Sequence, residues 1–408
     1  MPSLYESIRA NVNESGSDSR VEVNQRALID KILARYASAN AIFRECLQNS
    51  NDADATDAEI YFTVNAADGT VQQVMYRNNG LPFRTQDWSR LKKIAEGNPD
   101  VSKVGAFGVG AYTMFSICEE PLVISGKEAL AFVWKGDALW TKTAPNTTHD
   151  PKWTTFVLPS RDPYPMPDLV EFGEFLCASL TFTKCLRKIR VFVDEKERLT
   201  ITKTLRQEPR PVKTPKASSW WKSNGAITAS PNGTFFLGKS DESILESIYE
   251  VNVELDGVES SVKARFVSAV AKTRIPADME RRMHRVTKKQ PPKQVTVQIF
   301  LNAKETIGRP QNAAERITQS FSPQAGAGRI FIGFRTSQTT GLAAHLSAPF
   351  VPTVEREAMD LQDVTLKVFN TELLEFAGIL MRLTLEHTMS IIDVEWQANA
   401  PEREKLEK

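Results

Sequence analysis

The reactive polar residues of this chain are most concentrated in a helix-like stretch that runs from Arg44 to Ala53. At 100° per residue, Glu45, Asn49 and Asp52 fall within about 60° of one another on one helical face. A carboxylate beside an amide oxygen suits a hard cation and an attacking water, because Mg²⁺ prefers oxygen ligands and water deprotonation needs a fixed base. Taken alone, the same spacing is also that of the solvated side of an amphipathic helix.

A glycine-rich segment from Val104 to Tyr112 lies at the start of an apolar run. Glycine lets backbone N–H groups approach a ligand closely and adopt positive φ. A helix that begins near Gly108 would direct its N-terminal amides and the positive end of its dipole at phosphate oxygens. A lone glycine pattern of this kind is as often a tight turn, but beside the Glu45 helix we expect phosphate binding.

Two further stretches complete an ordered set of motifs. Val74 to Phe83 runs a strand into a turn, and Trp153 to Leu158 is a strand that carries threonines. In chain order, the stretches 44–53, 74–83, 104–112 and 153–158 resemble the N, G1 and G2 boxes and the closing threonine strand of the GHKL ATPases, particularly the heat-shock protein 90 and sacsin branch. The resemblance covers roughly residues 20 to 160, and the ordered set is more specific than any single motif.

The resemblance implies an ATP site with Mg²⁺. In it, Glu45 would orient and deprotonate the attacking water, and Asn49 would hold the metal. Residues 84 to 103 lie where the superfamily has a mobile lid that closes over the phosphates. The other residues that the resemblance assigns to the nucleotide are Asp52 and Lys103 as supports of pocket and lid, Gly80, Gly105, Phe107, Gly108, Val109 and Gly110 around the nucleotide, and Asn78 with Thr155 at adenine.

Asn78 departs from the pattern of the superfamily. Most members have an aspartate there, which accepts a hydrogen bond from the adenine amino group. An amide oxygen still accepts that bond but loses the charge assistance, at a cost on the order of 1 kcal/mol or more. Adenine selectivity is therefore less secure than phosphate binding.

Length and composition set the outer bounds. The 408 residues suggest two or three domains at roughly 150 residues each. Lysine plus arginine (51) nearly balances aspartate plus glutamate (50), which argues against nucleic acid or an anionic membrane as a partner. No apolar run approaches the ~18 residues that span a bilayer. Four cysteines without metal-ligand spacing favour reduced thiols in the cytoplasm or nucleus.

The apolar patterns predict an α/β fold. We expect an N-terminal Bergerat-type α/β sandwich, a mixed sheet with helices on one face, followed by an α+β transducer-like domain and a C-terminal helical segment. The expected bounds are a flexible N-terminus at 1–20, the ATPase domain at 21–205, a linker rich in proline and basic residues at 206–219, the transducer-like domain at 220–356 and the helical segment at 357–408.

The second domain offers polar residues next to strand ends. Transducer domains in the superfamily supply a side chain that reaches the γ-phosphate, and Arg335, Gln338 and Arg356 are our candidates. Each of them also fits an ordinary surface hydrogen bond or ion pair. The basic run at 278–293 is more typical of a solvated helix face than of a nucleic-acid site.

Together, these residues predict Mg²⁺-dependent ATP binding, with ATP hydrolysis that drives lid closure and conformational switching in a chaperone-like protein. A protein client or partner and a nucleotide-dependent homodimer are the partners that this function implies. One alternative is a scaffold that senses nucleotide without turnover or binds none. Another is a MORC-like chromatin ATPase, which the basic run alone supports. Histidine kinase activity is not expected, because none of the four histidines lies in a recognisable phosphoacceptor helix.

Overall fold

The computed structural model describes residues 4–18, 23–34, 40–94, 110–147, 150–212, 230, 232–237, 244–302, 308–353 and 358–398, with side chains described as far as residue 390. The helices are α1 (Leu4–Ser15), α2 (Gln25–Leu33), α3 (Ala41–Asp52), α4 (Thr85–Leu91), the 3₁₀ helix η1 (Gly110–Ser116), α5 (Leu169–Ser179), α7 (Ala277–Thr287), α8 (Ala313–Ser320) and α9 (Val364–Ala398).

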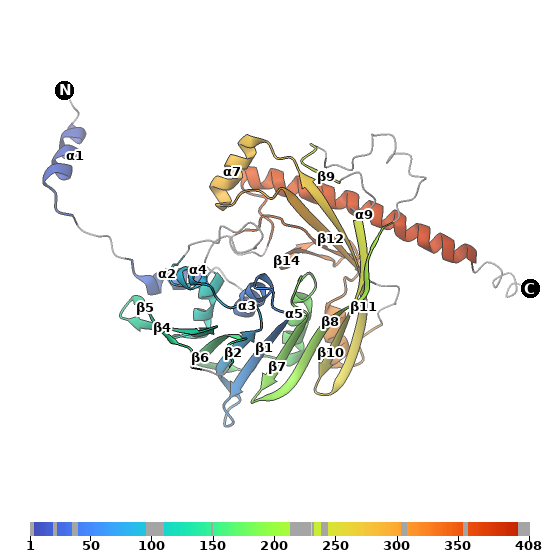
Figure 1. Ribbon diagram of the computed structural model, residues 1–408, viewed down its shortest axis with the longest axis horizontal. Helices are drawn as coiled ribbons and strands as arrows, with labels where there is room; N and C mark the ends of the chain where they lie inside the picture. Colours follow the sequence, from blue (N-terminus) through green and yellow to red (C-terminus); the bar gives the residue numbers. More distant parts are fainter. Residues whose placement is uncertain are drawn as a thin grey trace, which may run out of the picture.

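A long mixed sheet runs through the described structure (Figure 1). Its strands are β1 (Asp57–Val64), β2 (Thr70–Asn78), β3 (Leu122–Ser125), β4 (Glu128–Lys135), β5 (Ala138–Pro145), β6 (Thr154–Pro165), β7 (Lys188–Val193), β8 (Lys196–Pro211), β9 (Phe235–Leu237), β10 (Ile244–Leu255), β11 (Val258–Thr273), β12 (Gln294–Asn302), β13 (Arg329–Ile332), β14 (Phe334–Thr339) and β15 (Ala344–Ser347). They lie in the order β14-β13-β15-β12-β11-β10-β8-β7-β1-β2-β6-β3-β4-β5, and β9 pairs with β11. The predicted α/β class is confirmed.

Strand β1 lies at the centre of the N-terminal part of the sheet. It pairs antiparallel with β2 and parallel with β7. Alternate residues of β1, Ala58, Ile60 and Phe62, are buried on the same face, as the two-residue period of a strand requires. The adjacent Glu59 points to the other face, where Arg77 and Arg190 form ion pairs with its buried carboxylate. The sheet is therefore packed on both faces at this point.

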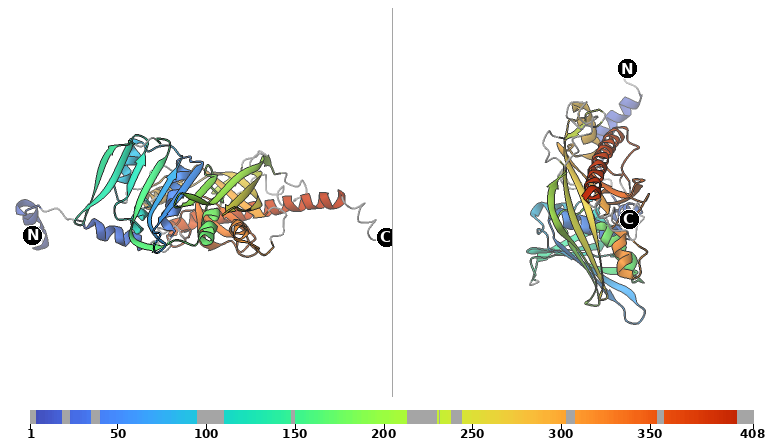
Figure 2. Two further views of the ribbon diagram at one scale, coloured as in Figure 1. Left: turned by 90° about the horizontal axis from the view of Figure 1, so that it is seen from below. Right: turned by 90° about the vertical axis from the view of Figure 1, so that its right-hand side faces the viewer.

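Two hydrophobic cores lie on opposite faces of the sheet. The first packs α3, η1, α5 and α8 against it and includes Phe266 and Phe300. The second packs α7 and α9 and includes the next-door residues Val267 and Ile299. Because successive side chains of a strand point to opposite faces, α9 covers the side of β11 and β12 that α8 leaves open. Figure 2 shows α9 running along the molecule and projecting beyond the strands.

The first core continues into the second half of the chain. Phe182, which follows α5, contacts the rings of Phe266 and Phe331 at centroid distances of 5.7 and 4.9 Å. Strand β8 pairs with β7 on one side and β10 on the other, and it continues to Pro211. Residues 206–211 of the proposed linker therefore lie in a central strand, while residues 213–219 lie outside the described part of the chain.

Helix α1 occupies residues that we expected to be a flexible N-terminus. None of its residues is buried, and Leu4, Tyr5, Ile8 and Val12 are all exposed. Figure 1 shows this helix apart from the sheet. Among the described residues, no helix combines the length and apolarity that crossing a bilayer requires.

A buried lysine fixes the loop between α5 and β7. The Nζ of Lys203 donates to the carbonyl oxygens of Leu180, Thr181 and Thr183 at 3.0 to 3.1 Å. Burial, with a smaller contribution from the charge of Arg187, lowers the pKa of Lys203 to about 7. Three carbonyl acceptors satisfy the three donors of its ammonium form. The lysine thus anchors the loop that reaches the C-terminal end of α3.

Candidate functional site

Helix α3 carries the first motif, and it is buried on more sides than an amphipathic surface helix. Phe43, Cys46 and Leu47 pack into the first core, as their spacing predicts. Glu45 is also buried, with 4% of its surface exposed, whereas Asn49 is exposed. Glu45 is therefore not part of a solvated stripe. A carboxylate held this far from solvent is a candidate for chemistry, because burial of an ionisable group is costly.

The C-terminal end of α3 is held by side chains of its own last turn. Asn51 Oδ1 accepts from the backbone N–H groups of Lys184 and Cys185 at 2.9 and 3.1 Å, in the loop that Lys203 fixes. Gln48 Nε2 donates to the carboxylate of the partly buried Asp52 at 2.9 Å. The helix therefore presents Glu45 and Asn49 from a position that is fixed at one end.

Gly110, the last glycine of the glycine-rich segment, packs directly on the Glu45 carboxylate. A Cβ on Gly110 would overlap the carboxylate and lie 2.7 Å from its carboxyl carbon. The backbone approaches this closely only because glycine has no side chain. Gly110 is buried at the start of η1, where its carbonyl accepts from Thr113 Oγ1 at 2.7 Å. The glycine-rich segment therefore meets the helix of residues 44–53 at Glu45.

Substituting Gly110 by alanine tests this contact. We expect Gly110→Ala to lower the unfolding midpoint, with a loss of about 1–3 kcal/mol, because the added methyl overlaps a buried carboxylate. Gly378→Ala is the matched control, since Gly378 lies in α9 with nothing near its Cβ position and alanine favours a helix. Urea unfolding measures both variants. A Gly110→Ala midpoint equal to that of the wild type would contradict the contact.

The turn after β2 rests on the same helix. Asn78 ends β2 with only 4% of its surface exposed, and its Oδ1 accepts from the N–H of Gly80 at 3.0 Å. The N–H of Leu81 donates to the carbonyl of Ala53 at 2.7 Å. A Cβ on Gly80 would lie 2.7 Å from that same carbonyl oxygen. The motif of residues 74–83 therefore lies against the C-terminal end of α3.

The neighbouring Asn79 holds the turn in place. Its Oδ1 accepts from the N–H groups of Thr56 and Asp57, both at 2.9 Å, and its Nδ2 donates to the side chains of the same two residues. Its side-chain oxygen and nitrogen are thus both used inside the protein. Asn79 is thus a structural residue, while Asn78 faces the candidate site.

Strand β6 places Thr154, rather than the predicted Thr155, beside Asn78. Thr154 pairs with Asn78 across β2 and β6, and only 3% of its surface is exposed. Its Oγ1 lies 2.6 Å from Ser125 Oγ, which also accepts from the N–H of Phe83 at 2.9 Å. Thr155 pairs with Arg77 and faces the other side of the sheet. Strand alternation was the available signal, but the register against β2 was not readable from the sequence.

Several predicted residues lie outside the described part of the chain. They are Lys103, Gly105, Phe107, Gly108, Val109 and Arg356, together with residues 95–103 of the predicted lid. Within the described part of that lid, α4 is a short helix whose first turn is closed by a capping box between Arg84 and Asp87. The hydroxyl of Tyr112 in η1 donates to the carbonyl of Leu91 at the end of α4, at 3.1 Å. The two ends of the segment between α4 and η1 thus lie close together.

The second-domain candidates are on β14. Arg335 is exposed on this strand, which lies against α5. Gln338 Oε1 accepts from the N–H of Met359 at 2.8 Å. This bond holds Met359, two residues beyond the segment 354–357 in which Arg356 falls. The structure therefore shows a positioning contact for Gln338.

Burial sets the chemistry of the thiols. Burial, reinforced by the Glu45 charge, raises the pKa of the Cys46 thiol well above its usual range. Burial likewise raises the pKa values of Cys118 and Cys177 to about 12. Cysteine thiols of this kind are protonated and unreactive, because the thiolate is the nucleophile and metal ligand. Among the described residues, no group of three His, Cys, Asp or Glu side chains is arranged to hold a metal by itself.

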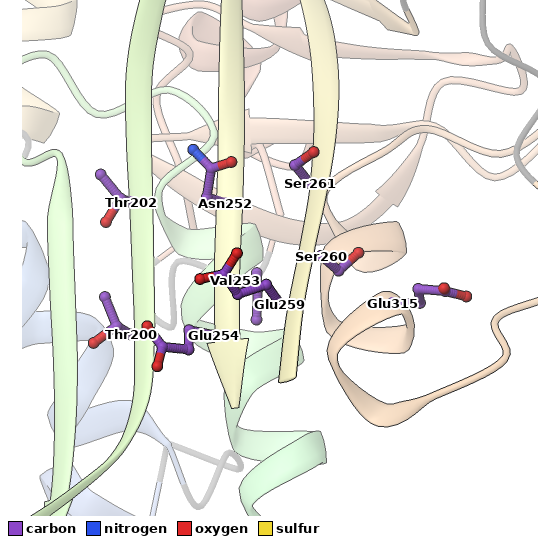
Figure 3. A pocket seen from close by; sticks show the side chains of 9 residues that line it. All are labelled: Thr200, Thr202, Asn252, Val253, Glu254, Glu259, Ser260, Ser261 and Glu315. Carbon is purple, nitrogen blue, oxygen red and sulfur yellow. The ribbon is translucent and has the colours of Figure 1, made fainter. Parts of the chain in front are cut away.

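An open groove with a volume of about 610 Å³ lies over β8, β10 and β11 and extends to Glu315 of α8 (Figure 3). Among the described residues, three carboxylates line it and no lysine or arginine does, so it suits an anionic triphosphate poorly. We therefore place the candidate site at α3. The residues that line the groove are Thr200, Thr202, Asn252, Val253, Glu254, Glu259, Ser260, Ser261 and Glu315.

Comparison of the sequence with known proteins finds two family models and one relative. Residues 23–154, which contain all the described motif residues up to Thr154, match the family model described as the sacsin domain. The N-terminal part is similar to sacsin. Human sacsin is 30% identical over 109 residues, which cover 24% of this chain and 2% of sacsin. Residues 239–408 match a family described as a protein of unknown function (DUF3684). The chain thus covers only a small fraction of the relative that it matches.

Proposed function

We propose that this protein binds ATP with Mg²⁺ and hydrolyses it, using the two halves of the chain as a conformational switch. The observation that carries the proposal is the packing of Gly110 on the buried Glu45 carboxylate, on a helix whose other end meets the Asn78–Gly80 turn. Two motifs that are far apart in sequence thus pack on the helix that carries another. The similarity of residues 23–154 to the sacsin domain supports the same assignment. The GHKL superfamily and its Bergerat fold are part of the proposal.

The two glycines support the fit of a nucleotide. At Gly80 and Gly110 the space of a Cβ is taken by neighbouring atoms of the site, so both positions keep the backbone bare. Bare backbone at Gly110 would allow its N–H to approach a phosphorylated ligand closely, whereas the N–H of Gly80 donates to Asn78 Oδ1 and shapes the turn. The remaining glycines of the segment, at 105 and 108, complete the proposed phosphate contacts.

The side chains of α3 divide the work. Glu45 is the proposed base: it would hold the attacking water in line and accept its proton. Asn49, exposed one turn further on, would offer its amide oxygen to Mg²⁺. The metal, when bound, neutralises charge on the triphosphate. Thr154 and Ser125 form a hydroxyl pair. We place this pair, together with Asn78, at the nucleobase, in the role that the sequence suggested for Thr155.

The second half supplies the proposed response. Gln338 would act through its hydrogen bond to Met359, and Arg335 lies on the strand that contacts α5. Arg335, Gln338 and Arg356 remain our candidates for contacts with the γ-phosphate. The proposal further includes a protein client, a nucleotide-dependent homodimer and a location in the cytoplasm or nucleus.

Hydrogen exchange tests lid closure directly. We expect amides of residues 84–103 to gain protection when the protein binds a non-hydrolysable ATP analogue with Mg²⁺, and to gain less with ADP. The γ-phosphate is the group that the lid would contact, so its removal should release the segment. Amides of β11 and β12, on the far part of the sheet, provide the internal control. Equal exchange of residues 84–103 without nucleotide, with the analogue and with ADP would refute the proposed lid.

A further inference from the structure

The Asn78 side chain has a fixed orientation. Its Oδ1 accepts from the N–H of Gly80, two residues further on, in a local side-chain turn. Because a backbone N–H can only donate, it selects the oxygen of the amide and not the nitrogen. Nδ2 is therefore the end of the amide that points away from the turn. Among the hydrogen bonds of the described residues, none uses Asn78 Nδ2 as a donor.

The surroundings of Asn78 leave its NH₂ group without an evident protein acceptor in the described structure. Asn78 retains 4% of its surface, so its amide is nearly removed from solvent. The facing Thr154 Oγ1 is bonded to Ser125 Oγ at 2.6 Å, and Ser125 also accepts from Phe83. A ligand that presents an acceptor here can take a hydrogen bond from this NH₂ group.

We propose that Asn78 makes the base subsite select a purine with an acceptor at position 6, such as the 6-oxo group of inosine or guanosine nucleotides. The inference rests on the proposed nucleotide site and specifies its ligand further. A 6-oxo purine offers a carbonyl oxygen to Nδ2, whereas the 6-amino group of adenine sets a donor against a donor. An aspartate at this position would keep one oxygen on Gly80 and present a second acceptor oxygen, which fits adenine.

The neighbouring Asn79 shows why the effect belongs to Asn78. Both are asparagines of one turn, yet Asn79 uses its amide oxygen and nitrogen entirely on Thr56 and Asp57. Changing Asn79 to aspartate adds the same charge at nearly the same place without altering the group that faces the base. Asn79→Asp is therefore the matched control for charge alone.

Isothermal titration of the full chain with ATP and with inosine triphosphate, each with Mg²⁺, tests the proposal. These two nucleotides differ at position 6 and in the protonation of the adjacent ring nitrogen. We expect the wild type to bind inosine triphosphate about tenfold more tightly than ATP, and Asn78→Asp to reverse this preference. Asn79→Asp should keep the wild-type ratio, even if thermal unfolding shows a lower midpoint for that variant.

The remaining outcomes separate this proposal from the proposed function. Tighter binding of ATP by the wild type, or a ratio within twofold that Asn78→Asp leaves unchanged, overturns the base preference while nucleotide binding stands. Failure of both nucleotides to bind to folded wild-type protein overturns the nucleotide site and the base preference together.

Discussion

Replacing Glu45 by glutamine should leave ATP bound at near wild-type affinity while phosphate release falls to background. Glutamine keeps the shape of the side chain that packs on Gly110, but it cannot take the proton of the attacking water. A positioned acid–base group contributes roughly 10²–10⁴-fold, or about 3–5 kcal/mol, to the rate. Phosphate release at saturating Mg²⁺-ATP measures turnover, and calorimetry measures affinity.

Glu45→Ala provides the control for packing. It removes the carboxylate and the volume together, so it should lose turnover as the glutamine variant does but with a lower unfolding midpoint. If Glu45→Gln hydrolysed ATP as fast as the wild type, Glu45 would not be the base. If the wild type bound ATP tightly and never released phosphate, a nucleotide sensor would replace the enzyme.

Replacing Asn49 by alanine should remove Mg²⁺-ATP binding and hydrolysis together. The substitution takes away the amide oxygen that we assign to Mg²⁺ and leaves the triphosphate charge poorly neutralised. We expect a loss of affinity on the order of 100-fold. Because Asn49 is exposed and alanine favours a helix, stability should change little. Titration with and without Mg²⁺ separates a metal effect from a general loss of binding.

Asn51→Ala gives the opposite signature from the same helix. Asn51 Oδ1 holds the backbone of Lys184 and Cys185, so its loss should lower the unfolding midpoint. The folded fraction of that variant should still bind Mg²⁺-ATP. Unchanged Mg²⁺-ATP affinity in Asn49→Ala would remove Asn49 from the metal site.

The sequence predicted the parts of the fold that have local signals. The helical period around Glu45 placed Phe43, Cys46 and Leu47 in the core, and the apolar runs marked the central strands. The burial of Glu45 had no such signal, because it depends on Gly110, which lies 65 residues away along the chain. The spacing of apolar residues shows which face of a helix is apolar. It does not show which other part of the chain packs on that helix.

The register of paired strands also lies beyond a single sequence. Thr154 and Thr155 are neighbouring residues of the same type, so the sequence does not distinguish them. A shift of one residue in the strand register moves a side chain to the other face of the sheet. The composition of residues 206–219 predicted an exposed linker. Residues 206–211 lie in β8 instead, because the pairing of β8 with its neighbouring strands outweighs local propensity. The expected α-helix near Gly108 is a 3₁₀ helix from Gly110 where it is described, with Thr113 bonded back to Gly110.

The most direct test of the account is calorimetric titration of the wild-type chain with a non-hydrolysable ATP analogue, with and without Mg²⁺. The packing of Gly110 on Glu45, beside the turn at Asn78, predicts saturable binding of one nucleotide per chain that weakens strongly without Mg²⁺. Folded wild-type protein that shows no saturable binding of the analogue at millimolar concentration, with Mg²⁺ present, would contradict the nucleotide site at α3.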